Sequence, residues 1–166
     1  MNIETECKLI IEKPNPDTVR SMENYTESRI TQIYLKSENT THRVRRREYS
    51  DGRVVYTENK KVRISRMSST EYEREISEEE YTALAQNIEI GAAPLFKTRR
   101  TFTYEDKTVE LDYYDQWEKT CVMEIELLCE TETVEFPPFI KVLRDVTGKR
   151  EYSNHSMAHA FPEEII

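Results

Sequence analysis

Charged residues alternate with small or apolar residues along several short segments of this chain. At its start, Glu4, Glu6 and Lys8 occupy every second position of residues 3–9. Successive side chains of a β-strand point to opposite faces, so this alternation predicts a strand with one charged face. Five later segments repeat the alternation: residues 43–47, 71–76, 97–99, 110–113 and 124–127. Charged faces on this many strands indicate a polar interior.

The wider pattern of apolar residues and turn-forming residues predicts strands with few helices. Eight strands are expected over residues 3–9, 29–36, 43–49, 53–62, 71–76, 96–104, 108–114 and 121–128. Four helices are expected over residues 17–28, 78–88, 138–145 and 153–160. Asp51-Gly52 predicts a tight hairpin turn, and Ser77 with Glu80 predicts a capping box at the second helix.

Eight largely antiparallel strands favour an α+β fold built on a closed barrel, with the helices packed outside it. Closure removes exposed strand edges, and an eight-stranded barrel can hold a small ligand. A sandwich also accommodates eight strands, but it would place the charged faces in solvent. At 166 residues the chain fits one domain, which we expect to span residues 1–166.

Composition narrows the classes of partner and compartment. The chain has 24 Lys and Arg against 32 Asp and Glu, a formal charge of −8, which disfavours sequence-independent binding to duplex nucleic acid. Its three cysteines show no CxxC spacing, so they predict neither a disulfide framework nor a zinc site. No apolar run approaches the ~18 residues of a membrane-spanning helix. We therefore expect a soluble cytoplasmic protein.

The signs of the charged faces suggest what lies between them. Three faces are acidic, two are basic and the first is mixed. A single Glu-x-Glu is most simply a solvated face, but like charges repel along a strand, so many such faces in one small fold need opposite charge nearby. A polyphosphate with divalent cations would satisfy both signs, since carboxylates bind magnesium or manganese and arginines bind phosphate oxygens.

Taken in order, these motifs make the chain similar to the CYTH, or triphosphate tunnel metalloenzyme, superfamily along nearly its whole length. The resemblance is carried by Glu4-x-Glu6-x-Lys8, Arg43-x-Arg45, Lys60, Glu71-x-Glu73-x-Glu75, Lys97-x-Arg99, Glu110-x-Asp112 and Glu124-x-Glu126. Two later runs, residues 145–148 and 152–154, resemble its C-terminal helical element. The chain departs from the superfamily at Asp145, where a glutamate is common, and Lys61 is an alternative to Lys60.

The resemblance implies an eight-stranded barrel whose tunnel binds a triphosphate, with Mg²⁺ or Mn²⁺ as cofactor. The implied metal ligands are Glu4, Glu6, Glu124, Glu126 and Asp112. The implied triphosphate-binding residues are Lys8, Arg43, Arg45, Lys60, Lys97 and Arg99. The implied catalytic residues are Lys8, Asp112, Glu73 and Glu75, the three acids lying near a second metal or the attacking water. His42, His155 and His159 are expected to be structural or surface residues.

The activity implied by the resemblance is metal-dependent hydrolysis of inorganic triphosphate or a related triphosphate. No covalent nucleophile is needed for this reaction, and the sequence contains no Walker loop. Other activities of the superfamily stay open: RNA 5′-triphosphatase, nucleoside or thiamine triphosphatase, and class IV adenylate cyclase. So does a non-enzymatic barrel that binds polyphosphate or nucleotide. The expected partner is a small-molecule triphosphate or an RNA 5′ end, bound by a monomer or a homodimer.

Overall fold

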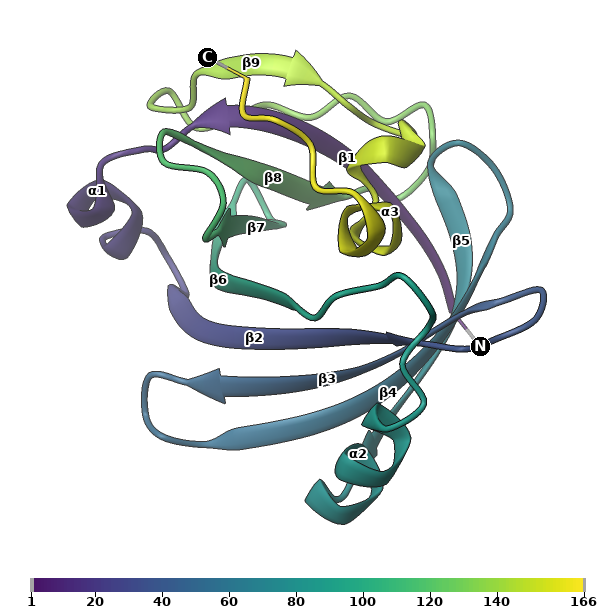
Figure 1. Ribbon diagram of the computed structural model, residues 1–166. Helices are drawn as coiled ribbons and strands as arrows, with labels where there is room; N and C mark the ends of the chain where they lie inside the picture. Colours follow the sequence, from purple (N-terminus) through teal and green to yellow (C-terminus); the bar gives the residue numbers. More distant parts are fainter. Residues whose placement is uncertain (1, 166) are drawn as a thin grey trace.

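The computed structural model describes residues 2–165, which form nine strands, eight of them arranged around a common interior (Figure 1). The strands are β1 (Asn2–Glu12), β2 (Thr26–Leu35), β3 (Thr41–Tyr49), β4 (Val54–Arg63), β5 (Ser68–Ile76), β6 (Leu95–Tyr104), β7 (Lys107–Tyr114), β8 (Thr120–Glu126) and β9 (Val142–Asp145). The helices are α1 (Pro16–Arg20), α2 (Glu78–Ala85), α3 (Asn154–His159) and the 3-10 turn η1 (Arg150–Tyr152).

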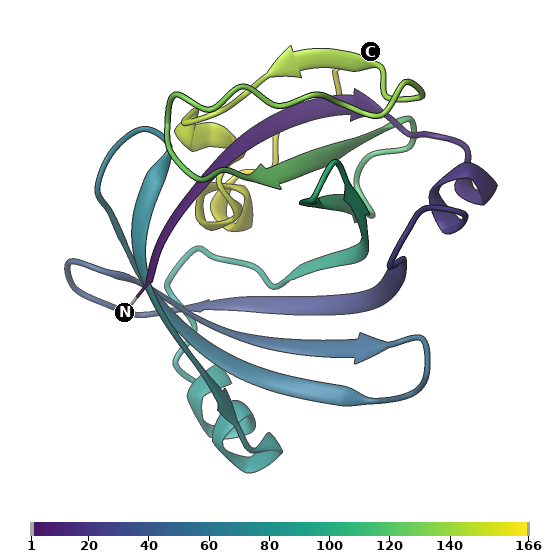
Figure 2. The same ribbon diagram turned by 180° about the vertical axis from the view of Figure 1, so that it is seen from behind.

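Eight of the strands close into an antiparallel barrel, as the sequence predicts. Their order is β5-β4-β3-β2-β6-β7-β8-β1, and β1 pairs back onto β5. β1 is long enough to serve two neighbours, because Asn2–Thr5 pair with β5 while residues 6–12 pair with β8. Figure 2 shows this strand curving along the wall from behind. The barrel therefore closes through a seam of only four residue pairs.

The helix predicted over residues 138–145 is wrong, because residues 142–145 form β9. This strand pairs with Leu9, Ile10 and Ile11 of β1, beyond the part of β1 that β5 covers. The physical reason is the unpaired edge that β1 would otherwise present there. Tertiary pairing thus overrides the local helical pattern.

The helix predicted over residues 17–28 is also wrong over most of its length. It ends at Arg20, and Asn24 adopts a left-handed backbone conformation with φ 56° before β2 begins at Thr26. The second helix ends at Ala85 rather than residue 88. Its N-terminus is capped by Ser77, but the Glu80 side chain pairs with Arg74 instead of completing a capping box. The predicted helix over residues 153–160 is confirmed as α3.

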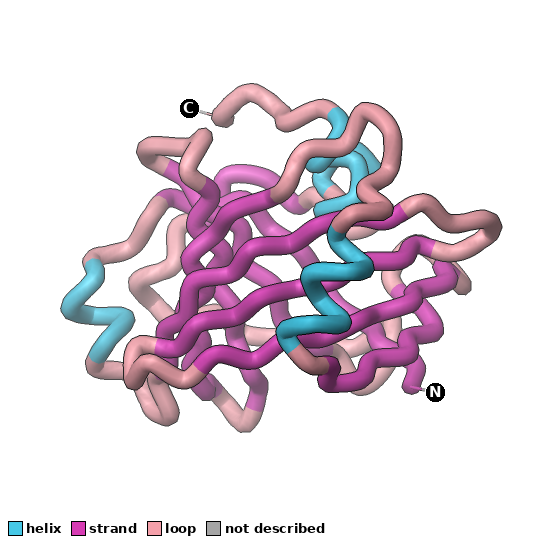
Figure 3. Tube along the Cα trace, turned by 60° about the horizontal axis from the view of Figure 1, so that its bottom comes forward, coloured by secondary structure: helices cyan, strands magenta, loops and turns pink. Residues whose placement is uncertain are grey.

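The outward faces of the strands carry two apolar layers. The larger layer joins β1, β7 and β8 with α1 and with residues 134–140, and its buried members include Leu9, Ile11, Leu111 and Met123. The smaller layer lies under α2, which crosses the outer face of the sheet in Figure 3. Apolar residues thus pack outward and leave the alternate, charged positions to point inward.

One end of the interior is apolar as well. Ile10, which shares the inward face of β1 with Lys8, packs with Tyr114, Val122, Met157 and other residues of β7, β8 and α3. Whereas α2 lies outside the barrel as predicted, α3 packs against these inward-facing residues. The remaining interior is left to charged side chains.

Two expectations from composition can be compared with the structure. Cys7, Cys121 and Cys129 are free thiols, and their spacing in the sequence predicts no disulfide framework. None of the helices within residues 2–165 has the length and hydropathy needed to cross a bilayer.

Leu111→Ala tests the outer apolar layer. Leu111 is fully buried there, so its truncation should destabilise the protein by about 2–5 kcal/mol through lost burial and the cavity left behind. Urea unfolding followed by circular dichroism measures the change. Leu128→Ala is the matched control, because Leu128 is 89% exposed and its truncation should change stability little. Equal stability losses in the two variants would contradict this description of the core.

Candidate functional site

A cavity of about 810 Å³ lies inside the barrel and carries most of the predicted site residues on its wall. Its basic lining residues are Lys8, Arg43, Arg45, Arg47, Lys61, Arg63, Arg66, Arg99, Lys149 and Arg150. Its acidic lining residues are Glu4, Glu6, Glu71, Glu73, Glu110 and Glu124. Ten basic and six acidic residues give this wall an excess of positive charge, although the whole chain carries −8. The cavity is therefore suited to an anion.

The glutamates of β1 and β8 lie across the cavity from the arginines of β3, although Glu71 of β5 lies 3.7 Å from Arg43 and Lys8 lies 3.3 Å from Glu124. Around the ring, β3 with its three arginines is four strands away from β8 in either direction. β8 and β1, which carry Glu124, Glu4 and Glu6, form the upper wall in Figure 1, and β3 with β4 forms the lower wall. A ligand between these walls meets carboxylates on one side and guanidinium groups on the other.

The carboxylates of β1 and β8 are crowded. Burial, followed by the nearby Glu124, raises the pKa of Glu6 well above its usual value. Burial also favours the neutral form of Glu124, but Lys8, Arg99 and Lys97 together outweigh it and lower the pKa of Glu124 to about 2. The Lys8 Nζ lies 3.3 Å from Glu124 Oε1. A cation placed beside Glu6 and Glu124 would relieve the repulsion between them.

The C-terminal segment positions Lys8. The backbone N–H of Lys8 donates to Thr147 Oγ1 at 3.0 Å, and its Nζ donates to the carbonyl of Tyr152 at 3.3 Å. Thr147 and Tyr152 belong to residues 145–148 and 152–154, the two runs that resemble the C-terminal helical element of the superfamily. These runs therefore lie against the first charged strand, and the start of α3 also lines the cavity.

The basic wall has unmet hydrogen-bonding capacity. Arg45 is buried and donates to the neutral Gln32 Oε1 at 3.1 and 2.9 Å, and it makes no ion pair with an acid in residues 2–165. Burial, with Arg43 and Arg99 nearby, lowers the pKa of Arg45 to about 9. The buried Arg43 Nε has no hydrogen-bond partner. Such a donor is costly unless a ligand accepts from it.

Asp112 and Lys97 do not line the cavity, contrary to the prediction for both. They are 1% and 0% exposed, and Lys97 Nζ donates to Asp112 Oδ2 at 2.8 Å. Arg99 donates to both Asp112 oxygens at 2.8 and 2.9 Å. Although burial favours the neutral acid, Arg99 and Lys97 hold the pKa of Asp112 well below its usual range. The Asp112 carboxylate is thus paired with two basic side chains. Of Asp112, Lys97 and Arg99, only Arg99 lines the cavity.

Three further predicted residues lie outside the cavity wall. Lys60 is exposed, whereas its alternative Lys61 lines the cavity and pairs with Glu4 Oε2 at 3.3 Å. Glu75 and Glu126 are exposed near the ends of β5 and β8 and do not line the cavity. Glu73 does line it and accepts from Asn59 Nδ2 at 3.1 Å.

Lys61 faces inward because of the hairpin between β3 and β4. A two-residue Asp51-Gly52 turn would place Lys60 opposite Arg43. The structure instead has Gly52 N–H donating to the Tyr49 carbonyl, with Gly52 at φ 90°, which makes a three-residue loop. Arg43 consequently pairs with Asn59, and Lys61 pairs with Thr41. Shifting the register by one residue reverses which lysine faces inside.

Several cavity residues were not predicted. Glu71 and Glu110 belong to motifs quoted in the sequence, so strand parity could have identified them. The alternation does put Arg47 on the face of Arg43 and Arg45, and it lines the cavity without having been assigned a role. The others lie on or next to loops and at the C-terminal segment: Arg63, Arg66, Lys149 and Arg150. No periodicity marks those four residues, because only the folded chain brings their segments to the cavity.

The residues on the acidic wall fit a hard divalent cation. Their donor atoms are carboxylate oxygens, which Mg²⁺ and Mn²⁺ prefer. Within residues 2–165 these acids are not gathered into a group of three converging ligands. This arrangement still suits Mg²⁺, which usually takes one or two carboxylates and completes its shell with substrate phosphates and water. Glu6 and Glu124, with Glu4 beside them, are the residues that would hold it.

Comparison with known proteins places the chain in a family. The family described as CYTH domain matches residues 2–160. This chain belongs to the CYTH domain family. The match covers both the charged strands and the C-terminal segment that holds Lys8, so the predicted resemblance is confirmed. A search among curated proteins gave no match.

Solved structures share the fold of this CYTH domain. The inorganic triphosphatase NE1496 is 23% identical with a TM-score of 0.60, covering 98% of each chain. The PH1012 protein from Pyrococcus horikoshii OT3 is 15% identical with a TM-score of 0.56, covering 77% of this chain and 80% of that one. HpAC1 from Hippeastrum, described as having a dominant triphosphatase activity, is 18% identical with a TM-score of 0.50, covering 74% and 80%. At these identities the likeness concerns the fold.

Asp112→Asn tests the buried ion-pair network of the CYTH domain. Removing the charge leaves Lys97 and Arg99 without their shared counterion, so the protein should lose about 3–5 kcal/mol of stability. Asp115→Asn is the control, since the Asp115–Arg29 pair is more exposed and should be worth about 1 kcal/mol or less. Chemical unfolding of both variants gives the comparison. A D112N protein as stable as D115N would show that the network is not needed for folding.

Glu6→Gln should stabilise the metal-free protein at neutral pH. The raised pKa of Glu6 means that its ionised form is disfavoured in the folded state, so this destabilisation is present at high pH. It disappears as the pH falls through the folded-state pKa, and the difference between the two proteins should shrink accordingly. Thermal melting between pH 5 and 8 in chelator measures it. Glu38→Gln, at an exposed turn, should change nothing, and a less stable E6Q protein would refute the expectation.

Proposed function

We propose that this CYTH protein is a divalent-metal-dependent hydrolase of inorganic triphosphate or a closely related triphosphate. The observation that carries the proposal is the excess of basic residues on a cavity wall that also carries metal-type carboxylates. A simple anion site has little use for six glutamates, and a simple cation site has little use for ten basic residues. A polyphosphate bound together with Mg²⁺ or Mn²⁺ uses both.

Arg43, Arg45 and Arg99 would bind the phosphate chain. The unpartnered Arg43 Nε and the Arg45 guanidinium, which has only an amide oxygen as acceptor, both gain acceptors from phosphate oxygens. Arg99 is held rigidly by Asp112, so it needs little reorganisation when the charge develops. Asp112 and Lys97 thereby act as positioning residues. Lys8 and Lys61 would add charge from β1 and β4.

The reaction is an in-line displacement at the terminal phosphorus. Water forms a bond to phosphorus, the bridging P–O bond breaks, and inorganic phosphate and diphosphate leave. A bound Mg²⁺ or Mn²⁺ would neutralise phosphate charge and make water more acidic. Glu73, an exposed residue on the cavity wall that accepts a hydrogen bond from Asn59, would orient the water and take its proton.

The names of the structural neighbours support this choice of substrate. One neighbour is described as an inorganic triphosphatase and another as having a dominant triphosphatase activity. The apolar end of the barrel, with Ile10, Tyr114 and Met157, limits the charged space to one part of the interior. A small triphosphate needs only that part.

Two neighbouring lysines provide a matched test. Lys61→Ala should lower phosphate release from tripolyphosphate by about 100-fold, because it removes a charge from the cavity wall. Lys60→Ala should leave the rate unchanged, because Lys60 is exposed outside that wall. A phosphate-release assay with Mg²⁺ and then with Mn²⁺ measures both proteins. A loss in K60A with normal K61A would overturn the assignment.

The substrate itself is tested with the unmodified protein. Tripolyphosphate, ATP, thiamine triphosphate and 5′-triphosphate RNA are compared with each metal, alongside a cyclic-AMP readout. Tripolyphosphate should be hydrolysed fastest, and chelation of the metal should abolish turnover. Release of phosphate from none of the four would refute the proposed hydrolase, and preferred turnover of another compound would replace tripolyphosphate as the substrate.

A further inference from the structure

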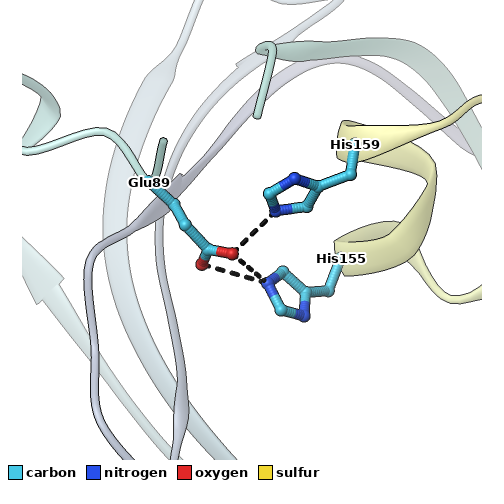
Figure 4. Close-up of side chains that lie close together, drawn as sticks. All are labelled: Glu89, His155 and His159. Carbon is cyan, nitrogen blue, oxygen red and sulfur yellow. Dashed lines mark hydrogen bonds and ion pairs between the residues drawn. The ribbon is translucent and has the colours of Figure 1, made fainter. Parts of the chain in front are cut away.

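Three side chains outside the proposed triphosphate chemistry converge on one point. Figure 4 shows Glu89 facing His155 and His159, whose ring nitrogens are directed toward its carboxylate. His159 Nε2 lies 2.7 Å from Glu89 Oε1, and His155 Nε2 lies 3.1 Å from each Glu89 oxygen. Within residues 2–165 this is the only group of three such side chains whose ligand atoms all lie within 4.8 Å of one another.

Backbone hydrogen bonds and helix geometry bring the three residues together. His155 and His159 are four residues apart on α3, which places them on one helical face. Glu89 is anchored by its backbone N–H, which donates to the Tyr34 carbonyl at 2.9 Å. Ala93 N–H donates to the carbonyl of Ala158 at 2.8 Å, so the segment after α2 is tied directly to α3.

The donor set and spacing suit a borderline-soft metal ion. Two imidazole nitrogens and a carboxylate oxygen are a common zinc donor set, with bond lengths near 2.0–2.2 Å. A tetrahedral zinc site therefore separates its ligand atoms by about 3.3 Å. The Glu89–His separations of 2.7 and 3.1 Å need to widen by about 0.6 and 0.2 Å to reach that spacing. The ligand atoms of all three residues lie within 4.8 Å of one another, so small side-chain rotations suffice to bring them to one ion. The three side chains are 30–38% exposed, so an ion can reach them from solvent.

We propose that Glu89, His155 and His159 form a second metal site, selective for Zn²⁺ or a similar transition-metal dication. Its metal preference differs from that of the carboxylates on β1 and β8, because imidazole ligands disfavour Mg²⁺. Three protein ligands leave a coordination position for water or a solute. The site is independent of the proposed hydrolysis, although His155 also lies on the cavity wall.

An ion at this site would clamp α3 onto the chain that leads into β6. α3 packs against the apolar end of the barrel, and its first residues line the cavity. Zinc binding to the folded state alone would therefore stabilise that corner of the molecule. In the metal-free protein the same residues form a hydrogen-bonded cluster in which the two histidines lower the pKa of Glu89, outweighing the opposite effect of its partial burial.

The test is a Zn²⁺ titration of the whole chelator-stripped chain in excess Mg²⁺, which occupies sites made only of oxygen ligands. We expect one Zn²⁺ per chain, a rise in melting temperature, and affinity about 100-fold weaker in His159→Ala and Glu89→Gln. Co²⁺ in place of Zn²⁺ should give visible absorption bands of a low-symmetry site, and these bands should be lost in both variants. Neither readout depends on triphosphate turnover.

His42→Ala is the matched control. The chain has three histidines, and His42 is the one outside the proposed site. It pairs with Glu58 on β4, away from α3. A Cys129→Ser background removes the exposed thiol, a competing zinc ligand. Melting curves in chelator show that each variant is folded. Absence of saturable Zn²⁺ binding, equal binding in H159A and H42A, or binding lost in C129S would each overturn the proposal.

Discussion

A charged side chain inside a closed barrel needs a partner of opposite charge. In this protein the pairing is most complete at the buried Asp112 carboxylate. Its two oxygens receive Lys97 and Arg99 deep between β6 and β7. A single buried carboxylate therefore allows two basic side chains to exist in the interior. Without it, Lys97 would lose its ion pair and Arg99 would keep only Glu110 as an acidic partner.

Elsewhere in the barrel the charged side chains are not all paired, and the incompletely paired groups are basic on one wall and acidic on the other. The wall formed by β3 retains guanidinium groups with spare donors, while the wall formed by β1 and β8 retains crowded carboxylates. On each wall one charge is disfavoured, that of Arg45 on β3 and that of Glu6 on β1, because burial and nearby like charges oppose its charged form. Together they describe a ligand that is anionic and accompanied by a cation. Sites that bind strongly often store such unfavourable energy in the empty state.

Strand parity explains what the sequence could reveal. The alternation along β1 and β3 assigned Glu4, Glu6, Arg43 and Arg45 to the interior without any structure. Parity does not report depth, so it could not separate Arg99 on the wall from the fully buried Asp112.

Register and long-range pairing were the other sources of error. One extra loop residue at the hairpin exchanged Lys60 for Lys61, and the unpaired edge of β1 turned an expected helix into β9. The histidines of α3 are visible in the sequence as a four-residue spacing, but Glu89 lies 66 positions before the first of them. Only the folded chain unites them.

The short seam between β1 and β5 gives the first strand a second role. Glu4 lies within the four residue pairs that complete the ring, and Glu6 follows directly after them. Fraying of the N-terminal end would therefore open the ring and scatter the carboxylates in the same event. Conversely, a cation bound by both Glu4 and Glu6 would hold the ring closed at this seam. Binding of the cofactor and closure of the barrel would then be linked equilibria.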